Sequence, residues 1–222
     1  MPDRLRPSLP FAPEAVLVGD PGRALLLAQE LLGQPRMSNH ARGLWGYTGE
    51  TPEGRGLTIQ STGIGAPSAA AVLADLAELG VERAVRVGTC RAIEAGLHPG
   101  ELLIAAKTFA CDGVSRAHGR EAEFVTPDAA LLASLRDAAG ASTRAVATAS
   151  FDLAPHPSGS GHAYAATDLQ TAALFTLGAE IGLAVAALLI VAESAAGERL
   201  EDEPMAETAI HAGRAAAAAL SA

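Results

Sequence analysis

The chain repeats one local pattern, an apolar run that leads through a short turn into a helical stretch. The strand-like runs are residues 15–18, 56–61, 84–87, 101–106, 145–149 and 185–191. The helical patterns are residues 21–32, 67–79, 126–138, 168–181 and about 203–220. Strands that alternate with helices predict an α/β fold built on a substantially parallel sheet.

Length and composition are those of one globular domain. The chain has 222 residues, of which 49% are hydrophobic and 18% charged, so it is long enough to bury a core. No linker, repeat or low-complexity segment divides it, and we expect a single domain over residues 1–222. The loosest stretch, residues 154–166, contains glycine, proline and serine. It is predicted to be a surface loop and a candidate active-site flap.

Charge and cysteine content exclude several classes of function. The net charge of -9 argues against general nucleic-acid binding, which needs a basic face. Cys90, Cys111 and the six histidines lack metal-ligand spacing, so no metal and no cofactor are predicted. The N-terminal stretch has no apolar signal core, and the apolar tract 172–192 contains Glu180 and Gly182. We therefore expect a cytoplasmic protein with no membrane partner.

The first glycine turn is in "VLVGDPGRALLLAQ", residues 16–29. A strand ends at Gly19, Asp20 is a predicted N-cap, and Arg23 lies in the first turn of the next helix. Backbone N–H groups at such a turn favour an anion, and Arg23 can add a charged fork. The alternative is an ordinary strand–helix turn in which Arg23 pairs with Asp20.

The second turn, "STGIGAPSAA", is another strand–glycine–helix unit. Gly63 and Gly65 permit close approach of the backbone, and Pro67 opens the helix. The dinucleotide fingerprint calls for a third glycine where Ser68 stands, so the sequence argues against a dinucleotide site.

The third turn is in "AVRVGTCRAI", residues 84–93, and it poses a question about charge. Arg86 stands inside an apolar strand, although a guanidinium stays charged and is costly to bury without a partner. Either Arg86 pairs with an internal carboxylate or it points from the strand end at an anionic ligand. The stretch alone favours the internal pair.

Four motifs in register resemble the nucleoside phosphorylase family that includes purine nucleoside phosphorylase and uridine phosphorylase. They are "VGDPGRA", "ARGLWGYTGE", "STGIGAPSAA" and "VRVGTCRAI", and their order matches the family over about residues 15–115. A weaker match over residues 145–195 includes "ATDLQTAALFTLGAEIGLAVAALLIVAES". The resemblance implies a three-layer α/β sandwich around a twisted mixed, largely parallel sheet.

The resemblance also implies a phosphate site. The family's phosphate-binding positions fall on Gly19, Arg23, Arg86 and Thr89, and this reverses the interpretation of Arg86 in favour of an anionic ligand. Arg42 matches an arginine that the family supplies to the neighbouring subunit's phosphate. The expected partners are therefore a nucleoside, phosphate as co-substrate, and further copies of the chain in a dimer or a trimer of dimers.

The sugar site departs from the family pattern. Asp168-Leu169-Gln170 stands where the family has Glu-Met-Glu, and the family's second glutamate accepts hydrogen bonds from the sugar hydroxyls. Gln170 can accept through its carbonyl oxygen but loses the charge-assisted strength. We expect these three residues to line the sugar with weaker or altered binding. The alternative is that the sugar site has been lost.

The base end of the site also departs from the family. Glu193 matches the aspartate that protonates the departing purine, but it carries one more methylene, and the alternative is an ion pair or a solvent-facing side chain. Arg91 replaces a family glycine, where it either narrows the pocket, contacts an anionic group or pairs with Glu193. Cys90, Arg91 and Phe151 are the predicted base-binding residues, Phe151 with uncertain register. Glu193 and Arg86 are the predicted catalytic pair. The N-terminus lacks a histidine that the purine enzymes supply to a neighbouring subunit.

The implied reaction is phosphorolysis of the N-glycosidic bond of a nucleoside, which gives the free base and a pentose 1-phosphate. Purine is preferred because the segment after residue 150 lacks the glutamine and arginine with which uridine phosphorylases read uracil. Two alternatives stay open. One is a nucleoside hydrolase of the same fold, and the other is a catalytically weak protein that binds phosphate or a nucleotide.

Overall fold

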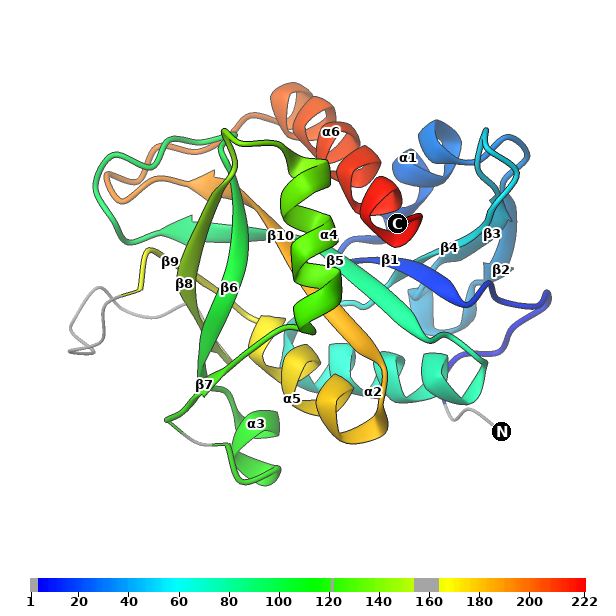
Figure 1. Ribbon diagram of the computed structural model, residues 1–222, viewed down its shortest axis with the longest axis horizontal. Helices are drawn as coiled ribbons and strands as arrows, with labels where there is room; N and C mark the ends of the chain where they lie inside the picture. The colour runs from blue at the N-terminus through cyan, green and yellow to red at the C-terminus, as the bar shows by residue number, and fades with distance from the viewer. Residues whose placement is uncertain (1–3, 121, 154–163) are drawn as a thin grey trace.

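The computed structural model describes residues 4–120, 122–153 and 164–222 (Figure 1). The strands are β1 Glu14–Val18, β2 Arg36–Asn39, β3 Gly46–Glu50, β4 Gly56–Ser61, β5 Arg83–Ala92, β6 Leu102–Cys111, β7 Phe124–Val125, β8 Arg144–Phe151, β9 Ala166–Asp168 and β10 Ala184–Glu193. The helices are α1 Pro21–Leu31, α2 Gly65–Glu78, α3 Gly113–Ala117, α4 Ala129–Ala139, α5 Thr171–Ile181 and α6 Asp202–Leu220, with a 3₁₀ turn at Ala41–Gly43.

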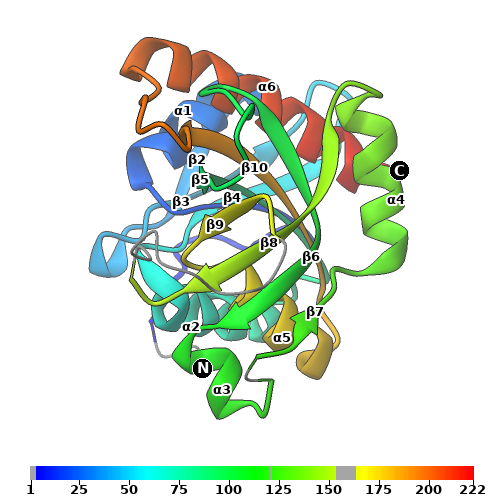
Figure 2. The ribbon, with the colours of Figure 1, turned by 90° about the vertical axis from the view of Figure 1, so that its left-hand side faces the viewer.

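All the described strands belong to one mixed sheet, in the order β10-β6-β8-β9-β5-β1-β4-β3-β2, with β7 on β6. Strands β4, β1, β5 and β10 are parallel at its centre. Because β10 also pairs with β6, and β9 bridges β8 and β5, these five strands close into a ring (Figure 2). The ring brings the ends of β5, β9 and β10 together.

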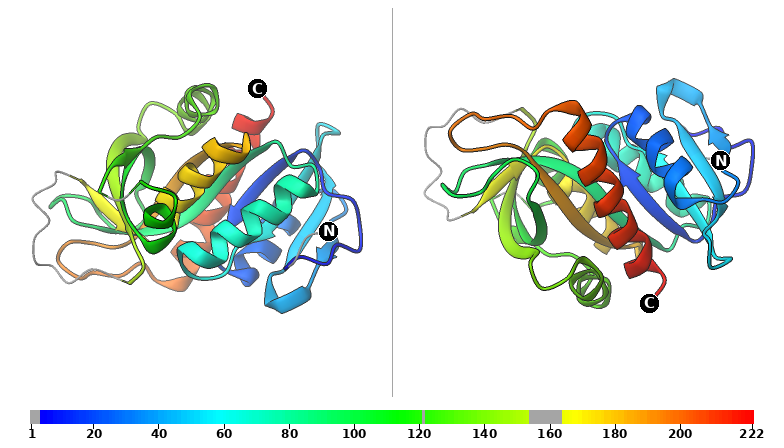
Figure 3. Two further views of the ribbon diagram at one scale, coloured as in Figure 1. Left: turned by 90° about the horizontal axis from the view of Figure 1, so that it is seen from below. Right: turned by 90° about the horizontal axis from the view of Figure 1, so that it is seen from above.

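Helices cover both faces of the sheet, as Figure 3 shows from two sides. Apolar residues of α2 and α5 form one buried cluster with one face of the sheet, and those of α1, α4 and α6 form a second with the opposite face. This is the predicted three-layer arrangement, and the α/β class and the mixed sheet are confirmed. The assignment of residues 1–222 to one domain stays a prediction.

The predicted strands and helices are present, with shifted ends. The strand predicted to stop before Gly88 continues to Ala92, because β10 pairs with β5 as far as Arg91 and β9 pairs with its last two residues. The strand β9 and the outer strands β2 and β3 have no counterpart among the predictions. The predicted flap covers residues 154–166. Residues 154–163 lie outside the described part of the chain, and Ala166 is the first residue of β9.

The apolar tract near the C-terminus divides as predicted into a helix, α5, and a strand, β10. None of the described helices combines the length and the apolar character that a membrane span requires.

One buried carboxylate ties the N-terminal segment to α2. Asp75 is 3% exposed, and its Oδ2 accepts hydrogen bonds of 2.7 Å from the backbone N–H groups of Arg4 and Leu5. The helical pattern of residues 67–79 places Asp75 on the polar side of the helix, and the chain ahead of β1 covers that position.

Replacing this carboxylate tests the anchoring. Asp75→Ala removes a charged acceptor from two backbone donors, and we expect the free energy of unfolding to fall by about 2 kcal/mol. Urea unfolding measures it. The matched variant Asp137→Ala alters an exposed residue of α4 and should shift the same quantity by no more than about 0.5 kcal/mol. Equal losses in the two variants would contradict the anchoring role.

Candidate active site

A cavity of about 760 Å³ opens at the carboxyl ends of the central strands. In parallel α/β sheets this edge is where ligands bind, and the volume lies in the range of small-molecule sites. It is lined by Gly19, Asp20, Pro21, Arg23, Gly63, Ile64, Gly65, Arg86, Gly88, Thr89, Cys90, Arg91, Thr167, Asp168, Leu169, Gln170, Ala192 and Glu193.

The start of α1 presents Arg23 to one end of this cavity. The Asp20 side chain caps the helix by accepting a 2.7 Å hydrogen bond from the Arg23 N–H, as predicted, and Pro21 occupies the first helical position. The Arg23 guanidinium has no hydrogen bond or ion pair with another described residue. Burial and the nearby Arg86 charge lower the pKa of Arg23, while Asp20 opposes the shift. A bound anion would offset this cost of burying the cation.

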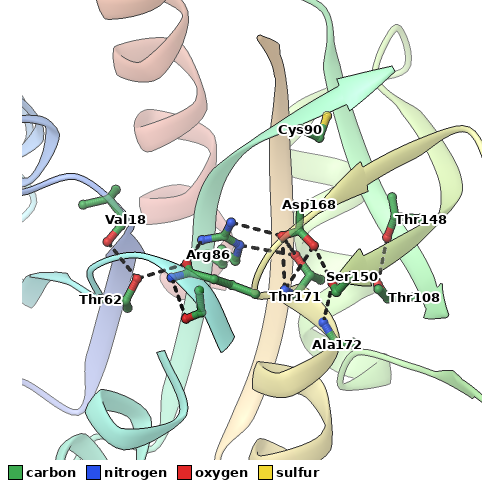
Figure 4. Close-up of polar contacts among 12 residues, drawn as sticks. Val18, Thr62, Arg86, Cys90, Thr108, Thr148, Ser150, Asp168, Thr171 and Ala172 are labelled. Carbon is green, nitrogen blue, oxygen red and sulfur yellow. Dashed lines mark hydrogen bonds and ion pairs between the residues drawn. The ribbon is translucent and has the colours of Figure 1, made fainter. Parts of the chain in front are cut away.

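Arg86 is buried inside β5, only 4% exposed, and is held by a polar network (Figure 4). Its guanidinium donates at 3.1 Å to Asp168 Oδ2, at 2.5 Å to Gln170 Oε1 and at 3.3 Å to Thr171 Oγ1. The Asp168 carboxylate also accepts from the Ser150 hydroxyl and from the Thr171 N–H and hydroxyl. An internal carboxylate therefore balances the Arg86 charge.

This network corrects the interpretation of Arg86 that followed from the family resemblance. The Arg86 charge does not depend on a bound anion alone, because Asp168 already pairs with it. This is the internal pair that residues 84–93 by themselves favoured. A guanidinium has five N–H donors, and three of them are engaged here. Arg86 lines the cavity, so its remaining donors can serve an anion there.

Gln170 is committed to the protein rather than free for a ligand. Its Oε1 accepts from Arg86 and, at 3.2 Å, from the Thr62 hydroxyl. Its Nε2 donates to the carbonyl oxygens of Gly63 at 2.8 Å and Gly65 at 3.2 Å. The Nε2 amino group therefore has both of its protons engaged. The Thr62 hydroxyl has one proton and also lies 3.1 Å from the Val18 carbonyl oxygen, so Arg86 is the one donor that Oε1 does not share. The prediction of a sugar-binding Gln170 did not anticipate these internal contacts.

Gly88 leaves the space that Arg86 needs. A Cβ on this residue would lie 2.5 Å from the Arg86 Cζ atom and from one of its terminal nitrogens. The Arg86 guanidinium therefore lies directly over the backbone of Gly88. A side chain at residue 88 would clash with it.

Arg91 and Glu193 line the other end of the cavity, and Arg199, outside the lining, also contacts Glu193. The Nε atom of Arg91 lies 3.3 Å from Glu193 Oε1, and the Nε atom of Arg199 lies 3.4 Å from Glu193 Oε2. Of the three alternatives for Arg91, the ion pair with Glu193 is thus present. Each carboxylate oxygen thus lies within ion-pair distance of a guanidinium nitrogen. The predicted role of Glu193 as a proton donor stays a prediction.

The remaining predicted site residues divide between the cavity and the rest of the molecule. Thr89 and Leu169 line the cavity and are half-buried. Cys90 lines it too, but burial, with a contribution from Asp168, raises the pKa of its thiol, so it stays protonated. Phe151 is not among the described lining residues, and its ring packs edge-on against Tyr164 at 6.4 Å.

Arg42 is exposed and stands in the left-handed region, with φ 59°. It lies outside the cavity lining of its own chain, and its side chain has no hydrogen bond or ion pair with the described residues. Its predicted role toward a neighbouring subunit stays a prediction.

The sequence predictions missed three residues that hydrogen-bond to the predicted site residues. Thr62, in the turn after β4, contacts Gln170. Ser150 of β8 contacts Asp168, and Thr171 of α5 contacts Arg86. The spacing Asp168-x-x-Thr171 is a helix-start pattern and could have placed the start of α5 at residue 171 rather than 168. No local signal links Arg199 to Glu193, because that contact depends on the turn after β10.

The crowding around Gly88 leads to a first test. Gly88→Ala should displace the Arg86 guanidinium and lower the free energy of unfolding by about 1–3 kcal/mol through overpacking, measured by urea unfolding. Gly33→Ala is the control, because a Cβ there meets only the Glu50 carbonyl oxygen at 3.8 Å. If both variants lose the same stability, the close approach of Arg86 is not what requires glycine.

The buried ion pair gives a second test. Asp168→Asn leaves Arg86 without its charged partner and should cost about 3 kcal/mol of stability. If the remaining Arg86 donors face an anion, inorganic phosphate should raise the melting temperature of this variant more than that of the unaltered protein. Sodium chloride at equal ionic strength controls for general salt effects. An equal phosphate effect on both proteins would show that Arg86 does not sense the anion.

Comparison with known proteins agrees with this geometry. Residues 13–222 match the phosphorylase superfamily. The chain is 30% identical over 194 residues to the purine nucleoside phosphorylase DeoD-type of Clostridium perfringens, covering 82% of each chain. It is 36% identical over 96 residues to the enzyme of that name from Oceanobacillus iheyensis, where the match spans 43% of this chain and only 40% of the relative. A match to the Actinobacillus succinogenes enzyme of that name spans 50% of the relative. The chain belongs to the phosphorylase superfamily.

Proposed function

We propose that this protein cleaves the N-glycosidic bond of a purine nucleoside with inorganic phosphate, giving the free base and a pentose 1-phosphate. The observation that carries the proposal is the Arg23 guanidinium, a largely buried cation without a described partner at one end of a nucleoside-sized cavity. Family membership supplies the reaction class.

Phosphate would bind between the turn after β1 and the part of β5 that carries Arg86 and Thr89. Arg23 offers an unpaired guanidinium, and Arg86 offers the donors that its network leaves free. Thr89 adds a hydroxyl, and the absence of a side chain on Gly19 lets an anion approach the backbone N–H groups of the turn. Arg42 from a neighbouring subunit would complete the site in a homo-oligomer.

The reaction then follows from position and charge. A phosphate oxygen attacks the anomeric carbon of the sugar as the bond to the base breaks, and the bond's electron pair leaves with the base. The sugar ring becomes positively charged in the transition state, and the adjacent phosphate stabilises it. Leu169 would pack against the sugar, while Asp168 and Gln170 position Arg86 and the backbone of residues 63–65.

Purine is the proposed base class. The relatives named above are purine nucleoside phosphorylases, and the cavity's far end holds Arg91 and Glu193 rather than an apolar wall. Cys90 lies between the two ends and offers a protonated thiol of low polarity against the substrate.

A nucleoside hydrolase is the second candidate, and one observation favours it. Arg86 is already balanced by Asp168, which leaves Arg23 as the one strongly cationic group at the phosphate end among the described residues of a single chain. A site with so little excess positive charge would bind phosphate weakly, and water could then be the nucleophile.

The deciding experiment is base release from inosine, guanosine, adenosine, uridine and thymidine, each with and without phosphate. Phosphate-dependent release from the purine nucleosides, with pentose 1-phosphate as product, is the expected result. Release that is independent of phosphate, with free pentose as product, would establish the hydrolase. Phosphate binding without release from any nucleoside would overturn both and leave a binding protein.

Arg23 provides the matching mutational test. Arg23→Met should raise the KM for phosphate about 10-fold to 100-fold, since a charge-assisted bond contributes about 1.5–3 kcal/mol. The control is Arg136→Met, which alters an exposed arginine of α4 outside the cavity lining and should leave the KM for phosphate unchanged. An unaltered KM in Arg23→Met would remove the central support of the proposal.

A further inference from the structure

Arg91 has an ion pair through one of its nitrogens and leaves the other two without a partner in the described part of the chain. Its Nε atom is paired with Glu193 Oε1, and its two terminal nitrogens have no hydrogen bond with the described residues. The side chain is 35% exposed and lines the cavity. The terminal nitrogens form a planar pair of donors that matches a ligand edge with two neighbouring acceptors.

The surrounding structure holds this donor pair in place. The backbone of Arg91 is paired on one side with Glu193 of β10 and on the other with Thr167 of β9. Glu193 is itself fixed by its second ion pair with Arg199. The Glu193 carboxylate lies at the Nε side of the guanidinium, so it does not occupy the two terminal nitrogens.

Arg91 lies at the end of the cavity where the base belongs. Residues two apart in a strand face the same side and are about 7 Å apart, so Arg91 follows Thr89 on that side of β5. Arg86 is five residues back, about 16 Å along an extended strand, and by the same alternation its side chain leaves the other side of β5. With phosphate held near Arg23 and Arg86, the nucleoside extends toward Arg91.

We propose that Arg91 reads the O6 and N7 atoms of a 6-oxopurine, so that the substrates are inosine- and guanosine-type nucleosides rather than adenosine-type ones. This inference rests on the proposed function. O6 and N7 are adjacent acceptors that a guanidinium contacts through two parallel hydrogen bonds. A 6-aminopurine presents an amino donor beside N7, which leaves one Arg91 donor facing another donor.

The same contact assists departure of the base. When the bond from the anomeric carbon to N9 breaks, its electron pair passes to the purine, and the negative charge spreads onto N7 and O6. Arg91 stabilises that charge through its two hydrogen bonds, and water supplies the proton that the released base takes up. Proton donation by Glu193 is then unnecessary, which fits a carboxylate held between two arginines.

The test compares kcat/KM for inosine and adenosine in the unaltered protein, Arg91→Met, Arg91→Lys and Arg199→Met. The unaltered protein should prefer inosine by about 10-fold to 100-fold, the discrimination expected of a two-bond guanidinium contact. Arg91→Met should abolish that preference, chiefly through loss of inosine activity. Arg91→Lys should retain only part of it, because an ammonium lacks the planar pair of donors. Arg199→Met should keep the preference, since Arg199 touches Glu193 but does not line the cavity.

Failure of this inference is distinguishable from failure of the proposed function. Phosphate-dependent cleavage with no inosine preference, or a preference that survives in Arg91→Met, overturns the role of Arg91 and leaves the phosphorylase reaction standing. If both arginine variants lose the preference equally, Arg91 acts only through Glu193. Calorimetric titration with hypoxanthine and adenine gives a readout without turnover. Tighter binding of hypoxanthine that is lost in Arg91→Met supports the inference, and equal affinities for both bases overturn it.

Discussion

The buried ion pair between Arg86 and Asp168 is the interaction around which the site is organised. A guanidinium in the middle of a sheet needs a charged partner, and Asp168 supplies it from the end of β9. Gln170 joins Arg86 to the carbonyl oxygens of residues 63 and 65, so strand β5, the end of β9 and the turn after β4 become one unit. The geometry of the phosphate end depends on this network more than on any one strand.

The network also changes the charge of the site. Arg86 and Asp168 cancel, and a neutral Gln170 takes the place of a family glutamate. The excess positive charge at this end therefore rests on Arg23, close to its capping neighbour Asp20. A site of this kind binds an anion through directed hydrogen bonds rather than through a large excess of positive charge. In the proposed function, the additional charge of Arg42 from a neighbouring subunit would therefore be important.

The opposite end of the cavity also carries ion pairs between a carboxylate and guanidinium groups. Glu193 is held between Arg91 and Arg199, and the replacement of a family glycine by Arg91 coincides with the replacement of an aspartate by Glu193. In this chain the two residues that depart from the family pattern form an ion pair with each other.

The sequence alone determined the strand–turn–helix order and the Asp20 cap, because glycine turns and proline starts are local properties. The order of its motifs, through the family resemblance, also indicated most of the predicted residues that line the cavity, though not Phe151, which lies outside the described lining. The sequence could not decide whether Arg86 pairs internally, since Asp168 is 82 residues away and meets it only when β9 joins β5. Likewise, the internal contacts of Gln170, the space above Gly88 and the second partner of Glu193 arise from contacts between distant segments. Charge compensation in a buried site depends on which side chains the sheet brings together, and only the tertiary structure specifies them.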